Sequence, residues 1–170
     1  MNAKSLRLLR IGTLILGWLL LAGVYAGVWG HLAIYYRGQN DPTGLLRNIQ
    51  TQFDLASALS SFFSGFGNAF LAFLVAAVFR MIEEEGPVGR ANSRALMIIC
   101  CLSYLADAFV RFYSVVLNLP ALRSVKGFGW LLPSYASTAV AVLIPVLYAA
   151  SIFVLYTHFT KMVTFESEVA

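Results

Sequence analysis

Residues 11–36, IGTLILGWLLLAGVYAGVWGHLAIYY, contain no Asp, Glu, Lys or Arg. A helix needs about 20 consecutive, mostly apolar residues to cross the hydrocarbon core of a membrane. The basic segment before this stretch, MNAKSLRLLR, resembles the start of a signal peptide. The apolar run, however, is longer than the roughly 7–15 residues of a signal-peptide core. We therefore interpret residues 11–36 as an uncleaved transmembrane span.

Three further apolar runs follow, at about residues 53–79, 95–117 and 130–159. Hydrophobic residues make up 59% of the 170 residues and charged residues only 12%, whereas soluble domains are about 45–50% apolar and about 25% charged. The connections between the runs are too short to hold a separate domain. We predict one all-α integral membrane domain over residues 1–170, with four transmembrane helices in an antiparallel bundle.

The distribution of basic residues predicts an orientation. If the N-terminus is cytoplasmic, seven Lys and Arg residues lie on that side of the membrane and four on the other. Cytoplasmic loops are normally the richer in basic residues, so we predict that both termini face the cytoplasm. The net charge of +4 does not indicate nucleic-acid binding, because the basic residues flank the apolar runs and do not gather on one face.

The third run carries charge inside its apolar sequence, in CLSYLADAFVRFY at residues 101–113. Residues three and four apart share one face of a helix, so the polar residues of this run form a single stripe. The stripe comprises Cys100, Ser103 or Tyr104, Asp107, Arg111, Ser114 and Asn118. The opposite face is wholly apolar and comprises Ile98, Leu102, Leu105, Phe109, Phe112 and Val116. This helix therefore has one interior side and one side for lipid or hydrophobic packing.

The second run carries a matching polar stripe in its first half. The stripe comprises Asp54, Ser57, Ser60, Ser61, Ser64, Gly65 and Asn68. With about 1.5 Å of rise per residue, Ser60 falls at the depth of Arg111, and Ser64 at the depth of Asp107. We predict that the second and third helices share a polar seam in the outer half of the membrane.

Asp107 and Arg111 stand four residues apart, within reach of an ion pair on one helix face. A charged side chain inside a membrane is costly, and it is by default a functional-site hypothesis. Two interpretations stay open: a structural clasp that fixes helix packing or engages a partner, and a site that handles a solute or a proton. Tyr104, beside the pair, could also help to line a pocket for a quinone or a lipid.

The first run contains a ladder of small residues, with Gly23, Gly27 and Gly30 in the segment AGVYAGVWG. The G-x-x-x-G spacing lets helix backbones approach closely. It predicts a helix–helix contact, either within the bundle or with another subunit. In the fourth run, Pro145 lies in mid-span, where its missing N–H frees the carbonyl of Ala141.

The two histidines fall near opposite membrane surfaces, His31 at the outer end of the first run and His158 at the inner end of the fourth. They cannot share one haem iron within a monomer. Each could singly ligate a haem or pigment shared with a partner, but an interfacial side chain is the simpler interpretation. The adjacent Cys100 and Cys101 form no CxxC motif. The sequence carries no catalytic or metal-binding motif, so we expect no enzyme activity, no metal and no cofactor of its own.

Two segments resemble a family of small four-span bacterial membrane proteins of unknown function. They are EEEGPVGRANSRALMIIC, at residues 83–100, and the ending FTKMVTFESEVA. In that family a Gly-Pro turn with an Asn leads into the third span, and an acidic tail closes the chain. The resemblance implies the four-span fold and a multi-pass location in a bacterial inner membrane. It implies no activity.

Three functions follow from these features as expectations. The first is a non-catalytic accessory subunit or interaction module of a larger membrane complex, with lipids and other membrane subunits as partners. The second is a small transporter or channel for a solute, an ion or a proton, which would use the polar seam. The third is a membrane anchor that bears a haem or pigment through His31 or His158.

Overall fold

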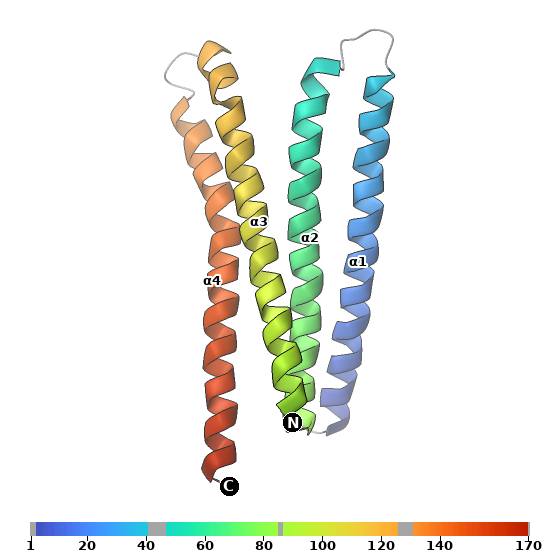
Figure 1. Cartoon of the computed structure of the whole chain (residues 1–170), viewed down its shortest axis with the longest axis vertical. Coiled ribbons are helices and arrows are strands. Elements are labelled where there is room, and N and C mark those ends of the chain that lie inside the picture. Colours follow the sequence, from blue (N-terminus) through green and yellow to red (C-terminus); the bar gives the residue numbers. More distant parts are fainter. Residues whose placement is uncertain (1–2, 41–46, 85–86, 126–130, 170) are drawn as a thin grey trace.

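The computed structural model describes residues 3–40, 47–84, 87–125 and 131–169. Its four helices are α1 (Ala3–Gln39), α2 (Arg47–Glu84), α3 (Pro87–Val125) and α4 (Leu131–Val169), shown in Figure 1. Each holds a segment long and apolar enough to cross a membrane, at Lys4–Arg37, Leu55–Glu83, Asn92–Val116 and Ala139–Lys161. The prediction of an all-helical chain with four such segments is confirmed, and it indicates a multi-pass membrane protein.

The helices extend beyond the predicted apolar runs. α3 has 39 residues, which makes it about 58 Å long at 1.5 Å per residue. It begins at Pro87, and proline suits the first position of a helix because no N–H is needed there. A hydrocarbon core is about 30 Å thick, so the ends of such helices are long enough to project beyond it.

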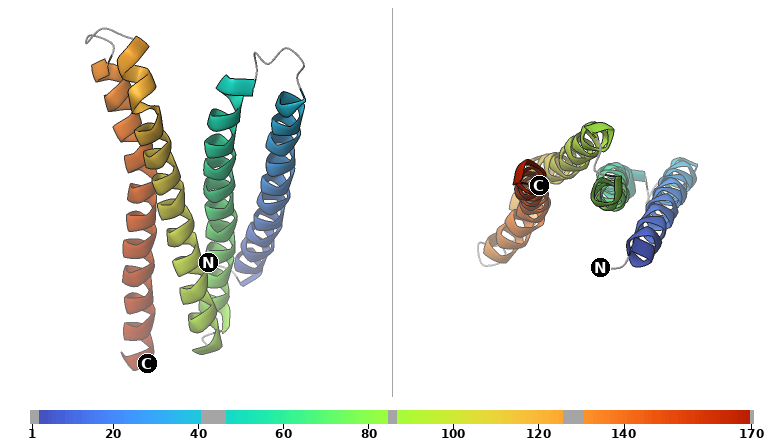
Figure 2. Two further views of the ribbon diagram at one scale, coloured as in Figure 1. Left: turned by 45° about the horizontal axis from the view of Figure 1, so that its top comes forward. Right: turned by 90° about the horizontal axis from the view of Figure 1, so that it is seen from below.

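The four helices form an open helical bundle in which each helix packs against its neighbour in sequence. The packed pairs are α1 with α2, α2 with α3, and α3 with α4. The view from below in Figure 2 shows α1 and α4 at opposite ends of this row. The two inner helices, α2 and α3, are therefore the ones with neighbours on two sides.

The contact between α1 and α2 depends on one glycine from each helix. A Cβ atom at Gly17 would lie 2.5–2.9 Å from ring atoms of Phe73, and one at Gly65 would lie 2.5 Å from Cγ2 of Val24. The rings of Trp18 and Phe73 meet edge to face, with their centroids 5.5 Å apart. The absence of a side chain at these two glycines therefore lets α1 and α2 approach closely.

The core lies between α2, α3 and α4, and aliphatic, aromatic and sulfur-containing side chains fill it. Its buried members are Leu74, Met97, Cys100, Tyr104, Ala149, Ile152 and Tyr156. The ring of Tyr104 stacks on that of Tyr148 from α4, with centroids 5.6 Å apart. On the other side of α3 the predicted apolar face is exposed, with Phe109 at 68% and Leu102 at 59%. The predicted division of α3 into an interior side and an apolar outer side is therefore confirmed.

Candidate functional site

The polar seam joins α2 to α3 at Asp107, whose residue surface is only 1% exposed. Its Oδ1 atom accepts a hydrogen bond from Nε of Arg111 at 2.9 Å, one turn along the same helix. The same oxygen accepts a second hydrogen bond from Oγ of Ser60 at 2.5 Å, across on α2. A carboxylate out of water needs such partners. The predicted ion pair within α3 is confirmed, and its carboxylate also links α3 to α2 through Ser60.

Asp107 contacts Ser60 and not Ser64, which the depth comparison had placed at its level. The prediction assumed helices with parallel axes, in which equal numbers of residues give equal depths. Figure 1 shows that α3 is inclined to α2. At Asp107 the observed partner is displaced by one turn along α2 from the predicted one. The hydroxyl of Ser60 was visible in the sequence as a member of the stripe, but its pairing with Asp107 was missed.

One to two turns further along the seam, α2 and α3 close on each other. The hydroxyl of Tyr104 donates to Oδ1 of Asn68 at 2.6 Å, and Sγ of Cys100 donates to the carbonyl of Gly67 at 3.4 Å. A Cβ atom at Gly67 would lie 3.2–3.3 Å from the Tyr104 ring. The neighbouring Ser103 donates to the carbonyl of Ile99 on its own helix. Of the two residues predicted for this position, Tyr104 is thus the one that reaches α2.

A cavity of about 340 Å³ lies beside Arg111, between α2, α3 and α4. It is lined by Ala56, Ser57, Ser60 and Ser61 of α2, by Val110, Arg111, Ser114 and Val115 of α3, and by Ala141 and Val142 of α4. Four serines and one arginine therefore share a space with small apolar side chains. The part played by α4 was missed, although the carbonyl of Ala141, freed by Pro145, was a signal for it.

The other predicted members of the seam have different places. Ser57, Ser61 and Ser114 line the cavity. Ser64 is half-buried on α2. The side chains of Asp54 and Asn118 lie outside the described part of the structure.

The glycine ladder of α1 has no close neighbour among the described residues. A Cβ atom at Gly23, Gly27 or Gly30 would meet no described atom within 4 Å. Of the two predicted alternatives, a contact within the bundle is not found among the described residues, where Gly17 and Gly65 form the close contact instead. Gly17 lies about 120° around the helix from Gly23. Contact of the ladder with another subunit stays a prediction.

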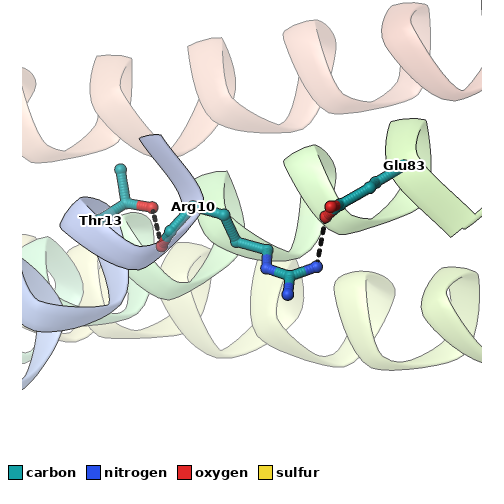
Figure 3. A network of polar contacts seen from close by, with 3 residues as sticks. All are labelled: Arg10, Thr13 and Glu83. Carbon is teal, nitrogen blue, oxygen red and sulfur yellow. Dashed lines mark hydrogen bonds and ion pairs between the residues drawn. The ribbon is translucent and has the colours of Figure 1, made fainter. Parts of the chain in front are cut away.

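A second set of polar contacts lies where α1 begins and α2 ends. Nη1 of Arg10 lies 2.5 Å from Oε2 of Glu83, and Figure 3 shows the two side chains pointing toward each other. Nearby, Thr13 donates back to the carbonyl of Arg10 at 2.9 Å. At the same end of α2, Ser93 of α3 bonds both Sδ of Met81 and the hydroxyl of Tyr156 from α4. This end of the molecule is therefore tied together across all four helices.

The two histidines lie far apart in the structure. His158 follows Tyr156 by two residues, at the end of the molecule that holds Arg10 and Ser93. His31 lies 21 residues beyond Arg10 along α1, a distance of about 30 Å. Among the described residues, no group of three or more His, Cys, Asp and Glu could hold a metal ion. Single ligation of a haem or pigment by either histidine stays a prediction.

Comparison of the chain with protein-family models, curated proteins and solved structures finds no match. The resemblance of the Gly-Pro turn and the acidic tail to a four-span family therefore stays a prediction. The interpretation of the seam and cavity depends on their own geometry.

Proposed function

We propose that this chain is a four-span protein of a bacterial inner membrane, with antiparallel spans and both termini in the cytoplasm. We propose further that it acts as a non-catalytic accessory subunit or interaction module of a larger membrane complex. The observation that carries this proposal is the unoccupied glycine ladder of α1. Helices in membranes associate through small residues that let their backbones approach.

The position of α1 at the edge of the row supports a contact with another subunit. α1 packs against α2 through Gly17 and Val24, and only 6% of its most apolar segment is buried within the chain. The ladder of Gly23, Gly27 and Gly30 lies on a different side of the helix from this contact. A transmembrane helix of a partner, with small residues of its own, fits that side.

The internal pairing of the seam supports a structural role for Asp107 and Arg111. Among the described residues, no buried side-chain nitrogen or oxygen lacks a hydrogen-bond partner. Breaking one member of a buried ion pair usually costs about 3–5 kcal/mol, because the other charge is left uncompensated. The seam is thus suited to hold α2 and α3 together as a firm support for α1.

Purification in a mild detergent, with identification of the chains that co-purify, tests the proposed role. Gly27→Leu is expected to release the partner, because it fills the ladder. Gly12→Leu is the matched control, since a side chain at Gly12 also meets no described atom within 4 Å and lies about 16 Å from Gly23 along the helix. A stable lone monomer from mildly extracted membranes would contradict the proposal.

The proposed orientation is tested by labelling single cysteines in intact cells. Cys100 and Cys101 are first replaced by Ala, and Lys4→Cys and Asn40→Cys are then introduced separately, at two exposed positions. A reagent that does not cross membranes is expected to label position 40 from outside and position 4 only after lysis. The reverse pattern would contradict the orientation.

A small transporter is the second candidate, because the cavity gives the seam a polar space beside Arg111. A flux assay on the reconstituted Asp107→Asn variant tests this function. If the chain is a transporter, flux should be lower than in the unchanged protein. A third candidate, an anchor for a haem or pigment, requires an absorption band in the visible range from the purified protein.

A further inference from the structure

The cavity beside Arg111 lies at the ends of three candidate spans. Its α2 residues fall within the first seven positions of Leu55–Glu83, and its α3 residues within the last seven of Asn92–Val116. Its α4 residues fall within the first four positions of Ala139–Lys161. At about 1.5 Å per residue, the whole lining lies within about 10 Å of the span ends. In an inserted chain this is the boundary between lipid headgroups and acyl chains.

Arg111 lines this cavity, and its ion-pair partner Asp107 is more deeply buried. The side chain of Arg111 is 37% exposed and that of Asp107 only 2%. The described lining includes Arg111 but not Asp107. Asp107 accepts the Nε–H of Arg111, and the two terminal nitrogens have no hydrogen-bond partner among the described residues. The pair therefore presents its positive end to the cavity.

The rest of the lining is divided between hydroxyl and apolar groups. Ser57 and Ser61 of α2 supply hydroxyls, and Val110, Val115 and Val142 supply apolar walls. A guanidinium is a planar fork of donors that matches phosphate oxygens, and it stays charged at any pH that a protein tolerates. The cavity thus combines an anion-binding group with a surface for a short stretch of hydrocarbon.

We infer that this cavity binds the phosphate group of a phospholipid, through the terminal nitrogens of Arg111 and the neighbouring serine hydroxyls. The apolar walls contact the glycerol and the first methylene groups of the lipid. A volume of about 340 Å³ is at the small end of ligand sites, which run from about 300 to 1,000 Å³, and it suits a headgroup. The inference rests on membrane insertion of the helices but not on any partner subunit.

Native mass spectrometry of the full chain in mild detergent tests the inference with three probes. They are dihexanoyl phosphatidylglycerol, dihexanoylglycerol, which lacks the phosphate, and inorganic phosphate alone. Phosphatidylglycerol is expected to bind more tightly than the other two by about tenfold to one-hundredfold, the usual range for hydrogen bonds to a charged group. Equal binding of dihexanoylglycerol would overturn the inference, and so would binding of inorganic phosphate as tight as that of the lipid.

Two variants locate the bound lipid. Arg111→Gln is expected to weaken phosphatidylglycerol binding by at least about tenfold, through loss of the charged donors. Because this change also disturbs Asp107, Ser57→Leu provides a second test that fills the cavity and leaves the ion pair intact. Ser151→Leu is the matched control at an exposed position on α4. Unchanged binding by Ser57→Leu, or an equal loss in Ser151→Leu, would overturn the site.

The partner and lipid tests can fail separately. A lone monomer that still binds phosphatidylglycerol through Arg111 would remove the subunit role and keep the lipid site. A stable complex whose Arg111→Gln and Ser57→Leu variants bind the lipid normally would do the opposite.

Discussion

Oγ of Ser60 on α2 lies 2.5 Å from Oδ1 of Asp107 on α3. That oxygen also accepts a hydrogen bond from Nε of Arg111, one turn along α3. One buried carboxylate oxygen therefore binds both the next turn of its own helix and the neighbouring helix α2. Above this point the seam opens into the cavity, and one turn below it the hydroxyl of Tyr104 bonds Asn68. The seam thus has an open part and a closed part, separated by Asp107.

The hydrogen bond between Ser60 and Asp107 predicts energetic coupling between these residues. In a double-mutant cycle of Ser60→Ala and Asp107→Asn, we expect a coupling between about 0.6 and 1.7 kcal/mol, the average and the maximum found between membrane helices. Unfolding of the detergent-solubilised protein measures it. The control cycle replaces Ser60→Ala with Ser64→Ala, one turn away, and should be additive. Additivity in both cycles would show that the contact does not stabilise the fold.

The bond from Tyr104 to Asn68 predicts a cost for removing one hydroxyl. Tyr104→Phe is expected to lower the free energy of unfolding by about 1 kcal/mol, a typical value for one hydrogen bond. Tyr148→Phe is the matched control, because Tyr148 stacks on the Tyr104 ring and is 55% exposed. Equal losses in the two variants would mean that ring packing, not the hydroxyl, matters here.

The glycines of α1 should respond in opposite directions to the same substitution. Gly17→Ala is expected to destabilise by about 1–3 kcal/mol, since the added carbon overlaps the Phe73 ring. Gly27→Ala meets open space within the chain, and it should be neutral or gain up to about 1 kcal/mol from helix propensity. Thermal unfolding of the isolated chain measures both. Phe73→Leu should restore part of the loss at Gly17, and its failure to do so would contradict the assigned contact.

The ion pair of Arg10 and Glu83 should be weaker than that of Asp107 and Arg111, and it should depend on salt. Its side chains are 23% and 27% exposed, and solvent-accessible pairs contribute about 0.2–1 kcal/mol. Glu83→Gln is expected to cost less than about 1 kcal/mol at low ionic strength. The cost should fall further near 1 M salt, where the screening length is about 3 Å. The free energies of unfolding of Glu83→Gln and Asp107→Asn are measured at both salt concentrations. The loss in Asp107→Asn should be larger and should not change with salt.

The sequence by itself determined the number of candidate spans and the faces of α3. Length and apolar composition identify a membrane-spanning helix, because about 20 mostly apolar residues are needed to cross the hydrocarbon core and a helix pairs its own backbone polar groups there. Helical spacing then places Cys100, Tyr104 and Asp107 on one side, and all three are buried. The ion pair of Asp107 and Arg111 was also predictable, because both residues belong to one helix and side chains four positions apart are neighbours on its surface.

Only the tertiary structure decided which residues meet across helices. The packing of α2 against α3 brings Asp107 to Ser60, and the packing of α4 brings Ala141 and Val142 to the cavity. It also assigns the close contact of α1 to Gly17, while Gly23, Gly27 and Gly30 remain open. Helical periodicity shows which residues share a face, but it does not show which face meets a neighbouring helix. The choice of the face that meets a neighbour therefore depends on crossing angles and packing order, and these are properties of the assembled helices.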